Sequence, residues 1–511
     1  MILKLSKGLV YGLLTIVAII ILATTLVINV KINHYEGVEY SVTNIFSFIF
    51  FTAIPLLIIL LIRKTNNKLN KKIKTILITA GIVCYIFVNI IWINKYKIEL
   101  IDDAKIINDI AVQISEGNSN LKENEYLQFC VQQIGGTHFF AGIYKLFNTT
   151  DFKLIQYINM ICNLMSMGML YLIFRKLANK YIENEMLFFV ILLTLFPLLL
   201  LSTYVYADYI GLFATLVSVY LLMKYAEKRR ALYIIISAIF MGFAYFIKTN
   251  YLIFFIAGVI YLLLNFINSI KETDLKQKIL QIFCIILFII ISVCPSVLFV
   301  KYIQKKYEWE NKPYPTNMWI YMGMAENPYR ANGWYNGDID KIVLNNPEKG
   351  KQEYSKKIKE RLSYFSSHPG YTVQFYLRKT VSMWAETTYQ SVYYNMPTGI
   401  AREGEWEEVV EKSDGIYSSF CDGKIYNMLI YYGKAISIVI YAGVIIYVLR
   451  YGKQTDINIM YLMTIFIGGF LFHTIWEAKS RYALPYLIII IPVGIIGIST
   501  KISIEMNKLK K

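Results

Sequence analysis

The chain alternates long apolar stretches with short polar segments, and each apolar stretch is about long enough to cross a bilayer. A hydrocarbon core of ~30 Å needs about 20 mostly apolar helical residues, and backbone groups in lipid must be satisfied internally, which favours helices. The pattern predicts an all-α polytopic membrane protein with about 12 transmembrane helices. The predicted spans are 8–30, 44–62, 75–94, 153–174, 185–203, 209–226, 231–247, 250–268, 278–300, 428–449, 457–475 and 483–500.

Lys and Arg predict the orientation of these spans. The segments that alternate with them on one side hold 24 Lys and Arg against 7 Asp and Glu. This surplus equals the formal net charge of +17, so the rest of the chain is balanced. Because cytoplasmic loops carry excess Lys and Arg, these segments and both termini are expected in the cytoplasm. The basic composition is thus a topology signal, and no nucleic-acid partner is implied. The segments are 1–7, 63–74, 175–185, 224–230, 269–278, 450–456 and 501–511.

Two segments on the other side are long enough to fold. Within 95–152, residues 101–116 have apolar side chains at helical spacing, and 129–147 are expected as a helix on the outer membrane surface. Residues 301–427 are expected to form an external mixed or mainly helical domain, with a helix over 352–367 that ends before His368-Pro369-Gly370.

Ionisable residues at the outer ends of spans are candidates for function. Asp102 and Asp103 follow the third span and point about 100° apart on a helix, so one acid could act as a general base while the other caps the helix. Two capping or solvated acids are the ordinary alternative. Asp208 lies in a short turn between spans, where an N-cap role is the alternative to lining the same cavity.

Cations lie at the same end. Lys248 interrupts an apolar run, either as a snorkelling lysine or as a cation for a lipid phosphate. Glu477 and Arg481 are four residues apart in the last outer turn and could form an ion pair, while Arg suits bidentate phosphate contact. We find no metal-ligand spacing in the sequence.

Several of these segments resemble, in their order, the GT-C superfamily of integral-membrane glycosyltransferases. The closer resemblance is to the family 39-like branch, which holds protein O-mannosyltransferases and lipid A aminoarabinose transferases, and to its Gram-positive members. It extends from about residue 95 to about residue 500. The segments are Ile101 to Ala111, Ile134 to Phe147, Tyr206 to Asp208, Gly242 to Lys248, Ser366 to Trp384 and Glu477 to Tyr482.

The resemblance implies a domain division and leaves one segment outside it. The spans in 75–300, with the loop 95–152, would form the catalytic module, 301–427 the extracytoplasmic domain, and 428–511 the last spans and a basic cytoplasmic tail. Residues 1–74 would form an additional N-terminal transmembrane hairpin of unknown role, because two spans precede the one that usually leads to the catalytic loop.

The resemblance also implies a reaction on the outer face of the cell membrane. A polyprenyl-phosphate-linked sugar would be the donor, and a hydroxyl of a cell-envelope glycan, lipid or protein the acceptor, with inversion. Asp103 or Asp102 would be the base and Asp208 would orient it or the acceptor. Lys248, Arg481 and Tyr482 would bind the donor phosphate, with Glu477 in support. Trp319, Trp334 and Tyr335 could stack on sugars or belong to the domain core. No cofactor is implied, and a divalent cation is left open.

Other functions fit the same pattern of spans. A lipid-linked glycan flippase or transporter is the main alternative, although the sequence shows no inverted repeat or pair of broken spans and no acids in mid-span. Ligation of a lipid-linked oligosaccharide to another glycan is a second enzymatic reading. A non-catalytic envelope-assembly protein is a third alternative.

Overall fold

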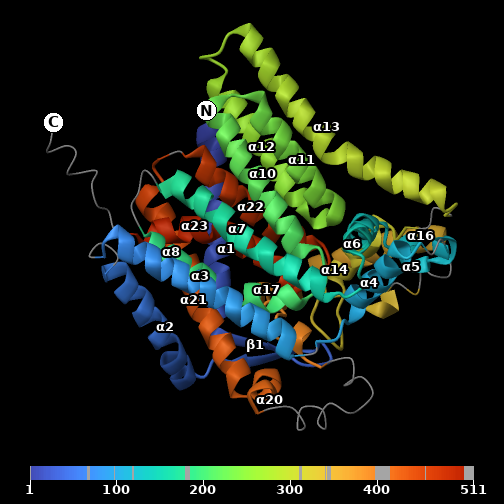
Figure 1. Cartoon of the computed structure of the whole chain (residues 1–511), viewed down its shortest axis with the longest axis horizontal. Helices are drawn as coiled ribbons and strands as arrows, with labels where there is room; N and C mark the ends of the chain where they lie inside the picture. The colour runs from blue at the N-terminus through green and yellow to red at the C-terminus, as the bar shows by residue number, and fades with distance from the viewer. Residues whose placement is uncertain are drawn as a thin grey trace.

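The computed structural model is nearly all helical, which confirms the predicted fold class (Figure 1). It describes residues 2–65, 69–96, 98–117, 120–178, 184–309, 313–339, 341, 347–397, 415–454 and 456–499, so the basic tail expected over 501–511 lies outside the described residues. Ten helices of this part are long and apolar enough to cross a membrane. They are α1 (Ile2–Val27), α2 (Ile45–Thr65), α3 (Lys71–Lys95), α7 (Lys153–Ala178), α10 (Asp208–Lys228), α12 (Leu252–Ser269), α13 (Leu275–Lys306), α21 (Lys424–Tyr451), α22 (Ile457–Ile475) and α23 (Leu484–Ile498).

The two remaining predicted spans are irregular. One is split into α8 (Glu185–Leu193) and α9 (Phe196–Leu200), which continues into the 3-10 turn η4 (Leu201–Thr203), with a bend of 48°. Pro197 opens α9, where its missing N–H costs no helical hydrogen bond. The other is α11 (Ala231–Ile247), an apolar helix of 17 residues.

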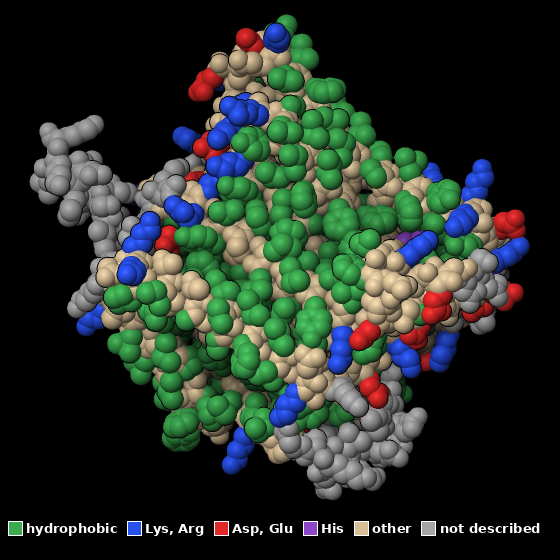
Figure 2. All heavy atoms as spheres, viewed as in Figure 1, with side chains coloured by type: hydrophobic (Ala, Val, Ile, Leu, Met, Phe, Trp, Pro, Cys, Tyr) green, Lys and Arg blue, Asp and Glu red, His purple; other side chains and the backbone are tan. Residues whose placement is uncertain are grey.

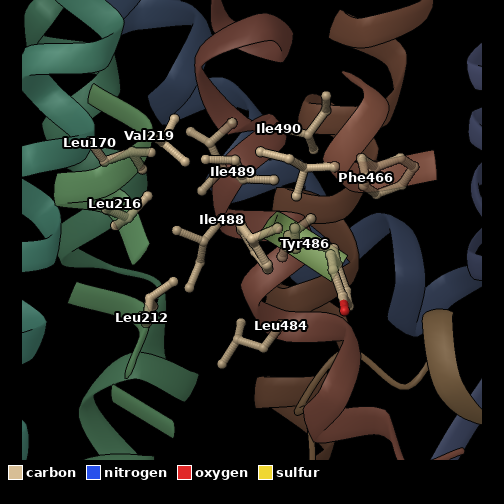
Figure 3. Packing of buried hydrophobic residues seen from close by; sticks show 14 of the residues in the cluster. Leu170, Leu212, Leu216, Val219, Phe466, Leu484, Tyr486, Ile488, Ile489 and Ile490 are labelled. Carbon is tan, nitrogen blue, oxygen red and sulfur yellow. The ribbon is translucent and has the colours of Figure 1, made fainter. Parts of the chain in front are cut away.

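Helix α23 forms the centre of the bundle. In the most apolar stretch of each helix, 83% of α23 is buried, against 11% of α2. Leu484 and Ile488 of α23 face Leu212 and Leu216 of α10 in Figure 3. On another side α23 packs closely against α21, because small residues let helix backbones approach. A Cβ atom on Gly497 would lie 1.8 Å from the Gly443 carbonyl oxygen.

The periphery of the bundle is apolar. α2, α3 and α13 expose rows of large hydrophobic side chains, as expected of helices that face lipid rather than protein. In Figure 2 the hydrophobic surface forms a broad band, and Lys, Arg, Asp and Glu gather toward the edges. These features identify a multi-pass membrane protein.

Short helices cover one end of the bundle. The first group follows α3 and consists of α4 (Asp102–Ser115), η2 (Asn120–Glu123), α5 (Glu125–Phe129), η3 (Val131–Gln133) and α6 (Ile134–Phe147). The second follows α13 and consists of α14 (Thr316–Met324), α16 (Pro347–Ser367), α17 (Pro369–Trp384), η6 (Tyr393–Asn395) and α20 (Gly415–Asp422). α4 confirms the helix predicted over 101–116, and α16 ends at Ser367, as the following Pro predicts.

The segment after α13 does not stand apart from the bundle. Trp334, Trp384, Tyr389 and Tyr393 belong to the same hydrophobic core as the membrane helices. The aromatic ring of Trp384 lies 5.5 Å from that of Phe466 in α22. These contacts bring residues of the 301–427 segment directly against the ends of the spans.

A β-hairpin replaces the end of the first predicted span. The span expected over 8–30 stops earlier, because α1 ends at Val27 and β1 (Ile28–Ile32) follows. β1 pairs with the antiparallel β2 (Val38–Val42), with Ile32 opposite Val38. The apolar residues of β1 extend the hydropathy signal, but their side chains alternate across a strand instead of continuing the helix.

Candidate active site

Asp208 joins two cations that come from distant parts of the chain. It is the first residue of α10, whereas Lys248 follows the last residue of α11 and Arg481 lies in η7 (Ser480–Ala483), directly before α23. Nζ of Lys248 forms an ion pair with Oδ1 of Asp208, and Nη1 of Arg481 donates to Oδ2 over 3.0 Å. Three of the predicted site residues therefore meet in one cluster.

The ends of the helices place these side chains. The Asp208 carboxylate stands at the start of α10, where backbone N–H groups without helical partners favour negative charge. The N-cap position itself belongs to Ala207, so Asp208 is not an N-cap residue. Lys248 has an extended backbone with φ −156° and ψ 112°, and its ion pair shows that it does not snorkel away from the protein.

Tyrosines enclose the two cations. The Arg481 side chain is 4% exposed and its Nε has no hydrogen-bond partner among the described residues. Lys248 lies over the Tyr206 ring at 4.1 Å from its centroid. Such cation–π contacts stabilise a cation that has left water. The four rings around the Arg481 guanidinium, at 4.9 to 5.5 Å, are those of Tyr204, Tyr206, Tyr394 and Tyr482.

The two adjacent acids at the start of α4 face different groups. Burial and, after it, the Asp103 carboxylate raise the pKa of the Tyr206 phenol. Burial lowers the pKa of Lys248 to about 8, and Asp208 and Asp103 oppose that shift. Asp102 instead accepts a hydrogen bond of 3.4 Å from the Tyr393 hydroxyl. Asp103 is thus the acid on the side of the Asp208 cluster.

The capping alternative for these acids is wrong. α4 begins at Asp102, and its N-cap is Ile101, which makes no side-chain capping bond. Asp102 has φ 50°, a left-handed conformation that is unusual for a residue other than glycine. Such strain is often found at functional sites.

Glu477 is a buried carboxyl near Arg481 and Asp103. Its expected pair with Arg481 is wrong: residues 477–479 are not helical, and the described contacts of Arg481 go to Asp208 instead. We find no ion pair of the Glu477 carboxylate with any described residue. Burial raises the pKa of Glu477 to about 7, although Lys479 and Arg481 lower it. The group can therefore hold a proton near neutral pH.

A second cluster beside the first was not predicted. Glu36, in the turn between β1 and β2, binds Lys479 through Oε1 at 2.8 Å and Arg330 through Oε2 at 2.7 Å. Gln390 donates to Oε1 at 2.9 Å. Lys479 lies in the same turn as Arg481, so the sequence offered a signal for it. The sequence around Glu36 shows only a short polar connection and offered no such signal.

The three aromatic residues predicted to bind sugar lie in two hydrophobic clusters. Trp334 is 1% exposed, packs in the core and donates to Ser382 over 3.1 Å. Trp319 packs against Tyr314 in a small hydrophobic cluster that also includes Tyr335. The Tyr335 ring lies 5.8 Å from the Arg330 guanidinium, beside the second cluster. Sugar binding by any of the three stays a prediction.

The space at the first cluster is narrow. A cavity of about 20 Å³, large enough for about one water molecule, is lined by Asp208, Arg481, Tyr204 and apolar residues of α10 and α23. Asp102 and Asp103 are half-buried and do not line this cavity. Among the described residues, no group of three or more His, Cys, Asp or Glu is arranged to hold a metal ion.

Comparison with known protein families indicates the class of this protein. Residues 134–297 match the family model described as dolichyl-phosphate-mannose-protein mannosyltransferase. The match confirms the resemblance to the GT-C superfamily and indicates a membrane glycosyltransferase of the GT-C type. It includes Asp208 and Lys248, while Asp103 and Arg481 lie outside it. No curated protein and no solved structure matches the chain.

Proposed function

We propose that the protein transfers a sugar from a polyprenyl-phosphate donor to a hydroxyl of a cell-envelope acceptor, with inversion. One observation carries the proposal: Asp208, Lys248 and Arg481 meet beside Asp103 at one end of the membrane helices. Two cations next to a half-buried acid suit a reaction in which a phosphate leaves and a hydroxyl loses its proton.

Lys248 and Arg481 bind the donor phosphate in this proposal. Each keeps hydrogen-bond donors beyond those that contact Asp208, since an ammonium has three N–H groups and a guanidinium has five. Nε of Arg481 is buried and has no partner among the described residues. Asp208 holds both cations in place before the donor arrives, which reduces the ordering cost of binding. Tyr482, whose ring centroid lies 4.9 Å from the Arg481 guanidinium, fixes the plane of that group.

Asp103 is the base in this proposal, because Asp103 rather than Asp102 acts on Tyr206 and Lys248. It takes the proton from the acceptor hydroxyl, and the acceptor oxygen attacks the anomeric carbon. The bond from that carbon to the phosphate oxygen breaks, and the phosphate leaves with the electron pair. Lys248 and Arg481 balance the negative charge that develops on the leaving phosphate.

The extracytoplasmic side is proposed from charge. The basic segments 224–230 and 269–278 lie at the ends of α10 and α12 that are opposite Asp208 and Lys248. Since basic loops stay in the cytoplasm, the site faces outward, where a flipped polyprenyl-phosphate sugar and envelope acceptors are present.

Transfer of label tests this proposal. Purified protein in vesicles is given a panel of radiolabelled polyprenyl-phosphate sugars and a cell-envelope extract as the acceptor. We expect label in the acceptor fraction with the wild type and none with Asp103→Asn. If no donor gives transfer but labelled lipid changes leaflet, the flippase alternative is correct and the proposal is wrong.

A further inference from the structure

The hairpin β1–β2 is fastened to the helices by buried polar contacts. Lys434 of α21 donates to the Ile28 carbonyl over 2.9 Å and to the Thr43 hydroxyl over 2.7 Å. The Tyr426 hydroxyl, also on α21, bonds both the N–H and the carbonyl of Ile32 at 3.0 Å. Val30 packs between these contacts against α17. A surface appendage would not need buried partners of this kind, so the hairpin has a fixed position.

The turn of the hairpin carries Glu36 inward. Asn33 accepts hydrogen bonds from Glu36 N–H at 3.0 Å and, through Oδ1, from Gly37 N–H at 2.8 Å. Glu36 adopts φ 62°, a conformation that costs energy for a residue with a Cβ. Its side chain is 1% exposed and contacts Lys479, Arg330 and Gln390. Both oxygens of the carboxylate are therefore used on residues outside the hairpin.

Glu36 is charged in this position. Burial alone would raise its pKa, but Lys479 and Arg330 more than offset burial, and the net effect lowers the pKa below the ordinary value. The same contact raises the pKa of Lys479 against the effect of burial. Asp102 also acts on Glu36, which places the acid pair of α4 near this second cluster.

Lys479 links the hairpin to the donor site. It stands two residues before Arg481 in the turn that joins α22 and α23. Its side chain binds Glu36, whereas the side chain of Arg481 binds Asp208. The turn is held at a third point, where Ala478 N–H donates to the Gly333 carbonyl at 2.9 Å, three residues after Arg330. Removal of Glu36 would release Arg330 and also Lys479, which lies in the turn that carries Arg481.

We infer that Glu36 is a positioning residue of the active site and that the β1–β2 hairpin is part of the catalytic machinery. By holding Lys479 and Arg330, Glu36 fixes the turn that presents Arg481 to an anionic lipid phosphate. This inference rests on the proposed function, and it gives the β1–β2 hairpin, which lies outside the family resemblance, an indirect role in donor binding.

The test measures binding of farnesyl phosphate to the purified full-length protein in detergent micelles. We expect Glu36→Gln to weaken the affinity about tenfold, because the turn loses its anchor. Glu39→Gln is the matched control. Glu39 lies on the same hairpin, is exposed and contacts Asn33 within the hairpin. This variant should bind like the wild type.

A double-mutant cycle separates positioning from folding. If Glu36 acts through Lys479, the Glu36→Gln change should have little further effect on affinity in a Lys479→Gln background. Affinities are compared per folded molecule, with the folded fraction taken from size-exclusion chromatography and thermal unfolding. The double variant removes the Glu36–Lys479 ion pair as a unit, so Lys479 is not left as an unpaired buried cation.

The outcomes are distinct for the two proposals. Unchanged affinity in folded Glu36→Gln, or equal effects of this change in both backgrounds, overturns the positioning role while leaving the proposed function intact. Failure of the wild type to bind farnesyl phosphate counts against the proposed function itself.

Discussion

Nη1 of Arg481 lies 3.0 Å from Oδ2 of Asp208, and the two residues are 273 positions apart in the chain. This contact joins the start of α10 to the turn before α23, and Lys248 binds the other oxygen of the same carboxylate. The three charged side chains are therefore paired with one another before a ligand binds. A phosphate that binds here meets cations whose positions are already set, which suits stabilisation of charge in a transition state.

Asp208→Asn should destabilise the protein and make it more responsive to ligand. Loss of the carboxylate leaves two largely buried cations without their partner, and such losses cost about 3–5 kcal/mol. We expect a lower melting temperature by differential scanning fluorimetry, and a larger rise on addition of farnesyl phosphate than in the wild type.

Asp338→Asn is the control for that prediction. Asp338 pairs with Lys341 at the surface, and exposed pairs contribute less than about 1 kcal/mol. Equal responses of the two variants to farnesyl phosphate would show that Asp208 does not hold a phosphate-binding pair.

Asp103→Asn and Asp102→Asn should separate the roles of the adjacent acids. A general base contributes about 10²–10⁴-fold to the rate, so Asp103→Asn should lower kcat by at least about a hundredfold while farnesyl phosphate still binds. Asp102→Asn should retain most of the turnover, because Asp102 faces Tyr393. Turnover of a radiolabelled donor in vesicles measures both. The reverse order of effects would make Asp102 the base.

Glu477 should make stability depend on pH. Its pKa rises from the ordinary 4.5 to about 7 in the folded protein. Between these values the folded protein holds a proton that the unfolded chain releases, so stability falls as the pH increases from about 5 to about 7. Glu477→Gln should remove this component. The measurement is the melting temperature of both proteins across this range, and parallel curves would contradict the assignment.

Gly497→Ala should disrupt the bundle, since the added Cβ would lie 1.8 Å from the Gly443 carbonyl oxygen and push α23 away from α21. Overpacking of this kind costs about 1–3 kcal/mol or more. Gly168→Ala is the matched control, because a Cβ on Gly168 in α7 would meet nothing within 4 Å. Thermal unfolding in detergent compares the two, and equal melting temperatures would argue against the close helix contact.

The membrane helices were predictable from the sequence because hydropathy is a local signal. Each predicted span corresponds to a described helix or to a broken pair, and the errors lie at boundaries such as residues 28–30, where an apolar strand follows α1. The helices α4 and α16 were predictable for the same reason: apolar spacing and a proline define them within a few residues.

The first cluster was partly predictable, because a charge at the end of an apolar span is costly and stands out. That reasoning found Asp208, Lys248 and Arg481 individually. It did not find the pairing of Arg481 with Asp208, and it assigned Glu477 as the partner from i,i+4 spacing, which applies only where the turn is helical.

The second cluster could not be predicted in this way. Glu36 is one charged residue in a polar connection, where charges are ordinary, and its partners Arg330 and Lys479 lie hundreds of residues away. The tyrosines around Arg481 were visible as a Tyr-rich composition but not as a cage, because they come from separate segments. Contacts between distant segments depend on packing that no local pattern encodes.

The most direct measurement is an electron cryomicroscopy structure of the protein in nanodiscs with a non-transferable polyprenyl-phosphate sugar analogue. The proposal predicts the phosphate in contact with the Lys248 amine and the Arg481 guanidinium, with the anomeric carbon directed toward Asp103. A lipid phosphate bound at the basic end of the helices, with Lys248 and Arg481 in contact with Asp208 alone, would contradict it.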